Sequence, residues 1–73
     1  MFVLHLYEAG SISDVPAGYY VDTIRLRDGR TKRLAERCIS KRSRRYRSFK
    51  GAETRGRNLM EMFSGIIVAV DIV

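Results

Sequence analysis

The sequence contains few of the residues that build covalent, metal or catalytic sites, with one cysteine and one histidine in 73 residues. The single cysteine, Cys38, excludes an internal disulfide and a zinc cluster made of several thiolates. Cys38 and His5 both lie in apolar patterns, which does not indicate a nucleophilic pair. The acidic residues are scattered singly, and no glycine-rich phosphate loop is present. We therefore expect no catalytic residue, no bound metal and no cofactor, and hence no enzyme.

Long hydrophobic runs are also missing. No apolar segment approaches the roughly 18 residues that a membrane-spanning helix needs. The apolar N-terminal stretch has no preceding basic residues and is soon interrupted by His5 and Glu8, which argues against a signal peptide. A lone thiol fits a reducing compartment. We expect a cytoplasmic monomer without membrane contact, folded as a single domain over residues 1–73 with a basic loop or arm at about 40–52.

The first part of the chain predicts strands. Residues 2–7 are aromatic and branched, which favours a strand, whereas residues 11–18 collect Ser, Asp, Pro and Gly and predict a loop. Residues 19–27 alternate with period two and predict a second strand. Tyr20 and Ile24 would share one face of this strand.

Two interpretations compete for the residues that follow Asp28-Gly29. An Asp-Gly pair between alternating segments is a strong hairpin signal and predicts a strand over residues 30–34. The spacing of Leu34, Ala35, Cys38 and Ile39 instead suits the apolar stripe of a helix over residues 31–43. The helical pattern is the stronger of the two, so we expect the helix.

The C-terminal part predicts one helix and one strand. Residues 53–63 carry Leu59, Met60 and Phe63 in a helical stripe, and Gly65 ends that helix. Residues 65–73 are β-branched on both faces, which favours a central position in the sheet. The predicted fold is α+β, a small antiparallel sheet of about three strands with one or two helices packed on one face.

Positive charge is concentrated in the middle of the chain. The segment 25–57 contains all 14 Lys and Arg residues but only three of the eight acidic residues. Because a block of like charge repels itself, this distribution indicates an anionic partner. The acidic flanks favour a molecule with two sides, one docking protein and the other facing nucleic acid.

The densest part of this block is the stretch 41–50, in which six of ten residues are cationic. Arginines and lysines would neutralise phosphates of RNA or DNA, and Tyr46 would stack on an unpaired base. Phe49 fits either stacking or packing against the core. The candidate binding residues are Arg25, Arg27, Lys41, Arg42, Arg44, Arg45, Tyr46, Arg47 and Lys50.

In length, basic middle and acidic ends, the chain resembles small bacteriophage-encoded regulators of host RNA polymerase, such as the initiation inhibitor and antiterminator of Xanthomonas phages. Residues 15–27, Val-Pro-Ala-Gly-Tyr-Tyr-Val-Asp-Thr-Ile-Arg-Leu-Arg, are similar to a turn and arginine-bearing strand in another phage polymerase inhibitor. The resemblance implies a protein that binds bacterial RNA polymerase near the RNA exit channel, inhibits initiation and prevents termination. Strand addition at residues 2–7 would be one way to dock.

Two other functions fit the same composition. A stand-alone RNA- or DNA-binding protein would bind nucleic acid directly with a steep salt dependence. An anti-CRISPR or anti-restriction inhibitor would instead occupy the nucleic-acid channel of a nuclease.

Overall fold

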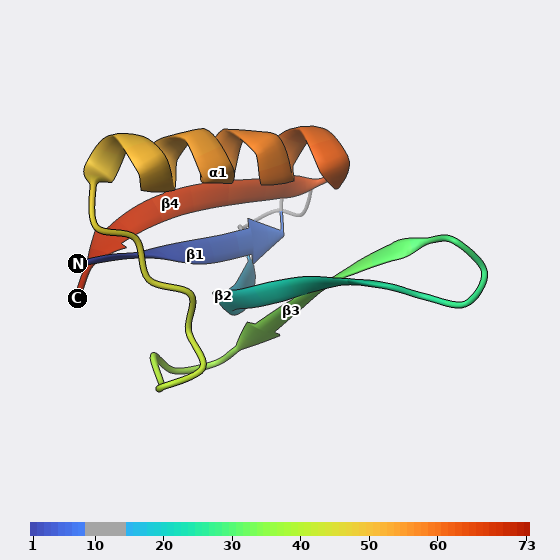
Figure 1. Ribbon diagram of the computed structural model, residues 1–73, viewed down its shortest axis with the longest axis horizontal. Helices are drawn as coiled ribbons and strands as arrows, with labels where there is room; N and C mark the ends of the chain where they lie inside the picture. Colours follow the sequence, from blue (N-terminus) through green and yellow to red (C-terminus); the bar gives the residue numbers. More distant parts are fainter. Residues whose placement is uncertain (9–14) are drawn as a thin grey trace.

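The fold is a four-stranded antiparallel sheet with one helix packed on it (Figure 1). The computed structural model describes the backbone of residues 1–8 and 15–73 and the side chains of residues 1–8 and 18–73. Within these residues the predicted α+β class is confirmed, with four strands instead of about three and a single helix. The elements are β1 (Phe2–Glu8), β2 (Val15–Arg25), β3 (Thr31–Glu36), α1 (Phe49–Met62) and β4 (Ile66–Ile72).

The strand order β3-β2-β1-β4 makes β1 a central strand and β4 an edge strand. The central position expected for residues 65–73 is therefore wrong. Apolar residues on both faces of a strand indicate that both faces are covered. They do not indicate whether another strand pairs along each of its two edges. Because β1 pairs with β2 and with β4, strand addition at residues 2–7 is also excluded.

Residues 31–36 form a strand, so the helix expected over residues 31–43 is wrong and the hairpin interpretation is confirmed. Gly29 has a φ of +87°, and Asp28 Oδ1 accepts a hydrogen bond from the Arg30 amide at 3.0 Å. The Leu26 amide also donates to the Arg30 carbonyl at 2.7 Å. These local bonds close the turn, and cross-strand pairing then outweighs the weak helical preference.

β2 begins at Val15, four residues before the predicted start; residues 11–14 of the expected loop lie outside the described residues. The register of β2 against β3 shifts between Tyr20 and Asp22, where the bulge inserts one extra residue. Tyr20 is consequently buried in the core, whereas Ile24 is 40% exposed. A simple alternation predicts the same face for both side chains, and the bulge makes that prediction wrong.

The helix α1 begins at Phe49, four residues before the predicted start, so the basic loop ends at residue 48 and not at 52. The Ser48 hydroxyl accepts a hydrogen bond from the Gly51 amide at 3.0 Å and caps the first turn. Gly56 faces the sheet, and a Cβ added there would lie 3.0 Å from Cγ1 of Val68. This glycine lets the helix approach β4 closely.

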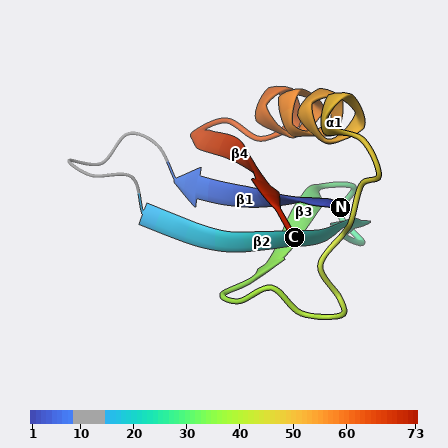
Figure 2. The same ribbon diagram turned by 90° about the vertical axis from the view of Figure 1, so that its left-hand side faces the viewer.

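The core lies between α1 and the β1–β4 half of the sheet, as the perpendicular view shows (Figure 2). The half formed by β2 and β3 extends beyond the helix and is not covered by it (Figure 1). The buried core residues are Leu4, Leu6, Tyr20, Ala52, Leu59 and Ile66.

Gly18 is the position where the sheet tolerates no side chain. Its φ is +110°, and an added Cβ would lie 2.5 Å from the Glu36 carbonyl oxygen. We expect Gly18→Ala to lower the free energy of unfolding by about 3 kcal/mol, because backbone strain and a clash with backbone act together. Urea unfolding measures the change. Gly29→Ala is the matched control: it has a positive φ but open space around it, and should cost only about 1 kcal/mol.

Candidate nucleic-acid interface

The basic segment 40–48 is built into the sheet and does not hang off it as an arm. The Arg44 amide donates to the Tyr20 carbonyl at 2.9 Å, which ties the segment to β2. The Tyr46 amide donates to the Phe2 carbonyl at 2.8 Å, and the Phe2 amide donates to the Tyr46 carbonyl at 2.9 Å. The segment thus continues the hydrogen bonding of β1 beyond its pairing with β2, and its cations start from a fixed backbone.

Hydrogen bonds from Arg45 stabilise a compact turn within this segment. The Ser43 side chain is almost completely buried, and its hydroxyl accepts a hydrogen bond from the Ser40 amide at 3.0 Å. The Arg45 guanidinium donates to the carbonyl oxygens of Ser40 at 3.0 Å and Ser43 at 3.2 Å. Arg45 therefore contributes to the shape of the turn as well as to its charge.

Two other predicted cations are held by acidic side chains. Arg44 lies 3.3 Å from Asp22, and Arg42 lies 3.8 Å from Glu36. A hydrogen bond from the Thr23 amide and the nearby Arg44 guanidinium lower the pKa of Asp22 below its ordinary value. These arginines are already partly neutralised before any phosphate approaches.

The two aromatic residues of the segment are placed differently. Tyr46 is half-buried against the core, and this burial raises the pKa of its hydroxyl. Phe49 is 53% exposed and makes an edge contact with Phe2, with ring centroids 5.9 Å apart. The exposed ring needed for base stacking is thus that of Phe49. Stacking by Tyr46 stays a prediction that its packing does not favour.

Arg55 is a cation that sequence reasoning missed as part of this surface. Its Nη2 atom donates to the Tyr20 hydroxyl at 3.1 Å, and that hydroxyl lies 2.6 Å from Oγ1 of Thr23. The guanidinium also lies 5.8 Å from the centre of the Tyr20 ring. The bond to Tyr20 raises the pKa of Arg55, so its charge is secure. The sequence does hold a signal for Arg55. It follows the core residue Ala52 by three positions, and residues with this spacing are neighbours on a helix surface.

The uncovered half of the sheet carries Arg33 beside Phe63 at the end of α1. The Arg33 guanidinium lies 5.5 Å from the Phe63 ring centre and 4.0 Å from Glu8. These three residues, with Thr31 and Ala35, line a shallow depression on the helix side of β3. Arg33 was not among the predicted site residues, because its orientation depends on the hairpin register.

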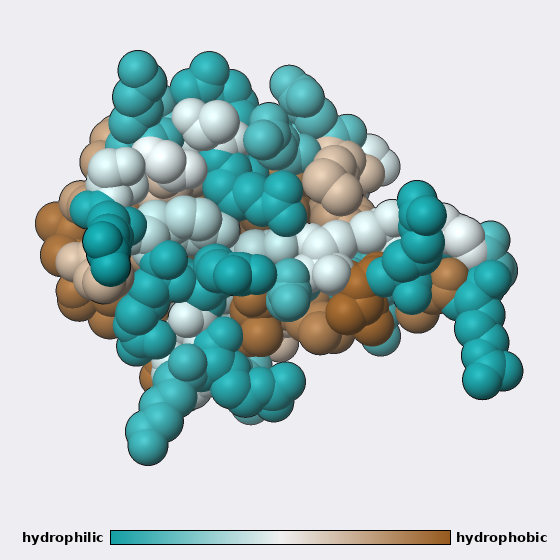
Figure 3. All heavy atoms as spheres, viewed as in Figure 1, coloured by the Kyte–Doolittle hydropathy of each residue, from teal (hydrophilic) through white to brown (hydrophobic). Residues whose placement is uncertain are grey.

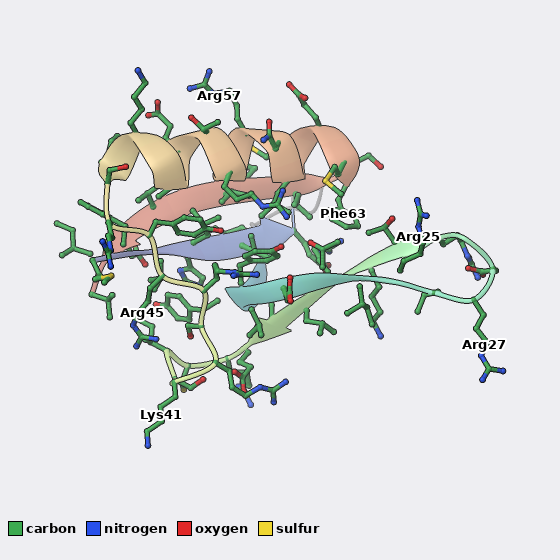
Figure 4. The ribbon with its side chains drawn as sticks, in the orientation of Figure 1. Arg25, Arg27, Lys41, Arg45, Arg57 and Phe63 are labelled. Carbon is green, nitrogen blue, oxygen red and sulfur yellow. The ribbon has the colours of Figure 1, made fainter. Side chains whose placement is uncertain are left out.

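The predicted site residues fall into two groups that lie apart. Arg25 and Arg27 are at the hairpin end, whereas Lys41 and Arg45 lie near the opposite end of the β2–β3 pair (Figure 4). Lys50 lies in the first turn of α1. Hydrophilic side chains project over both groups (Figure 3).

Half of the Lys and Arg side chains have no polar partner among the described residues. Within the described part of the chain, seven of the 14 Lys and Arg side chains form no ion pair or hydrogen bond. We call these seven residues the free cations: Arg25, Arg27, Lys32, Arg37, Lys41, Arg47 and Lys50.

Comparison of the chain with protein-family models, curated proteins and solved structures finds no match. No helix in the described ranges is long and apolar enough to cross a membrane. Among the same residues no three His, Cys, Asp or Glu side chains are grouped to hold a metal ion. The interface is therefore interpreted from its own geometry.

Removing the Tyr20 hydroxyl tests the contact between β2 and α1. Tyr20→Phe keeps the buried ring but deprives Arg55 and Thr23 of their shared partner. We expect the free energy of unfolding to fall by about 1–2 kcal/mol, measured by urea unfolding. Tyr19→Phe, on the neighbouring residue, leaves this bond in place and should change stability less.

The ionised carboxylate of Asp22 should make the free energy of unfolding sensitive to acid. Its folded-state pKa lies below the ordinary value of 3.8, so its contribution to stability is fully present above that pH. The contribution is lost as the pH falls through the lowered folded pKa. We expect Asp22→Asn to flatten the decline of unfolding free energy below about pH 4, measured by urea unfolding at several pH values. An unchanged acid profile would contradict the role given to Thr23 and Arg44.

Proposed function

We propose that the protein is a non-enzymatic regulator that binds a bacterial host RNA polymerase and presents its free cations to RNA near the exit channel. The choice of partner rests on the resemblance in length and charge layout to phage-encoded polymerase regulators. The mode of action rests on the arrangement of the cations. On this proposal the protein inhibits initiation and prevents termination.

One observation carries the proposal: Lys41 and Arg47, the free cations of the basic segment 40–48, extend from a backbone that is hydrogen-bonded to both β1 and β2. A cation on a fixed backbone loses less conformational freedom on binding than one on a mobile arm. Lys41 and Arg47 can therefore contact phosphates without the segment first becoming ordered. Such contacts supply affinity that decreases as salt increases.

The same arrangement gives a physical route to antitermination. A terminator hairpin forms where the nascent RNA leaves the polymerase, and its two strands must meet there. Cations that hold the phosphates of one strand would compete with that pairing. Because the contacts are to phosphate, the effect should not depend on the terminator sequence.

A second candidate is a stand-alone binder of single-stranded nucleic acid. The observation in its favour is the exposed ring of Phe49 between Arg47 and Lys50. An aromatic face flanked by cations is the arrangement that holds unpaired bases. Direct binding of a single-stranded oligonucleotide that is lost in Phe49→Ala would favour this candidate. Tight polymerase binding that survives the same substitution would favour the regulator.

Single-charge substitutions test the basic surface. Arg27→Ala and Lys41→Ala each remove one free cation, and we expect each to reduce the slope of log affinity against log salt by about 0.7 for a single strand. Fluorescence anisotropy with a labelled single-stranded RNA at several salt concentrations provides the measurement. Asn58→Asp is the matched control, because it also lowers the net charge by one and lies on an exposed side of α1, outside segment 40–48 and the hairpin. An equal loss with the control would contradict a localised surface.

The regulator is tested by separating binding from action. Lys41→Ala combined with Arg47→Ala removes two free cations that take no part in the turn, unlike Arg44 and Arg45. We expect polymerase binding within about threefold of the original protein and a marked fall in terminator readthrough in a purified transcription system. Loss of both with an unchanged melting temperature would place these cations in the polymerase contact instead.

A further inference from the structure

The outer edge of β4 presents unpaired backbone groups in a defined pattern. The Val73 amide donates to the Met1 carbonyl at 2.9 Å, and Phe2 pairs with Ile72 in the adjoining register. Because ladder bonds alternate along an antiparallel pair, the odd-numbered residues of β4 bond to β1. The amides and carbonyls that point away from the sheet belong to Ile66, Val68, Val70 and Ile72.

The two edges of the sheet are protected very differently. The edge strand β3 carries Lys32 and Arg33, and charges of this kind discourage pairing with another strand. The edge strand β4 carries only Asp71, which lies 3.7 Å from His5. Its remaining residues are apolar, and Ile72 is 82% exposed. A seven-residue apolar edge without Pro or Lys lacks the usual protection against strand addition.

The helix completes the docking surface above this edge. Glu53, Arg57 and Met60 lie on the flank of α1 that faces the free edge, and they line a groove with Val68 and Val70. The groove has an apolar floor and one charge of each sign at its rim. Glu53 lies 3.1 Å from Arg57 within the chain.

We propose that this surface binds a second copy of the chain, with the two β4 strands pairing antiparallel about a two-fold axis. The outward-facing groups of even-numbered residues in one copy then meet the equivalent groups in the other, as an isologous interface requires. The two helices lie antiparallel on the same face of a continuous sheet. Glu53 of each copy faces Arg57 of the other.

The strand and the helix place the axis at the same level. Gly56 packs against Val68, so the midpoint between Glu53 and Arg57 lies level with the Val68–Ala69 part of β4. An axis through that point pairs the central residues of β4 with their equivalents and also brings the opposite charges together. The helix contact and the strand pairing are therefore compatible with the same two-fold axis.

The charge layout permits this approach. Each copy carries a formal net charge of +6, which opposes association in general. The free cations of β2 and β3 lie beyond β1 from β4, and segment 40–48 bonds to β1 and β2 instead of to β4. Lys50 is the exception, because it lies in the first turn of α1. The dimer therefore keeps the two basic surfaces apart. The sequence analysis expected a monomer, and that expectation stays untested; the dimer is proposed because β4 is an edge strand.

The test exploits the Glu53–Arg57 contacts across the axis. Sedimentation velocity over a range of concentrations should show a monomer–dimer equilibrium for the original chain. Glu53→Arg and Arg57→Glu, each alone, turn both contacts repulsive, and we expect each to weaken dimerisation by about tenfold. The double substitution Glu53→Arg with Arg57→Glu restores opposite charges and should restore dimerisation.

The decisive sample is an equimolar mixture of the two single variants. In a mixed dimer the new arginine at position 53 faces the new glutamate at position 57, and the original Arg57 faces the original Glu53. The mixture should therefore associate more tightly than either variant alone, which only pairing between copies explains. Asn58→Arg, on another exposed side of α1, is the control and should dimerise normally.

A chain that stays monomeric at all concentrations, or a mixture that associates no better than its components, would overturn the proposal. In the monomeric case the edge would be left for a strand from another protein. The experiment contains neither nucleic acid nor polymerase, so its outcome is independent of the proposed function. Melting temperatures of all variants separate loss of association from loss of folding.

Discussion

The structure depends on the contacts made by Tyr20. Its ring fills the core, its carbonyl accepts the amide of Arg44, and its hydroxyl bonds to Arg55 and lies against Thr23. One buried residue thus joins β2, the basic segment and α1. The bulge after Tyr20 puts Ile24 on the opposite face of β2 from Tyr20, so the side chain of Tyr20 enters the core and that of Ile24 does not.

The cations have two kinds of task in this molecule. Arg44 and Arg45 donate to acceptors of the chain itself and hold the basic segment in place, and Arg55 joins α1 to Tyr20 of β2. The free cations bond to no acceptor of the described residues, and the proposed function assigns them to an anionic ligand. Net charge alone does not separate these two tasks, since a hydrogen-bonded arginine and a free one contribute equally to it. The separation requires the positions of carbonyl oxygens, which become defined only when the chain is folded.

Sequence patterns predicted the class of fold, the strands at residues 2–7 and 19–27, and the C-terminal helix, because these segments have clear periodicity. The segment after Gly29 was assigned wrongly because its helical spacing is local, whereas its pairing with β2 is not. The predicted central position of β4 was wrong for a similar reason, since the neighbours of a strand are determined by the whole sheet. Within the site, the clustering of charge was legible, but the burial of Tyr46 and the exposure of Phe49 were not.

The pairing of Phe2 with Ile72 has a consequence for how the chain folds. These residues are separated by almost the whole sequence, so the central strand acquires one neighbour only when the ends of the chain meet. Closing so long a loop costs more entropy than closing the β2–β3 hairpin. Topologies dominated by distant pairings fold slowly for their size. We therefore expect the hairpin to form early and the core beneath α1 to close last.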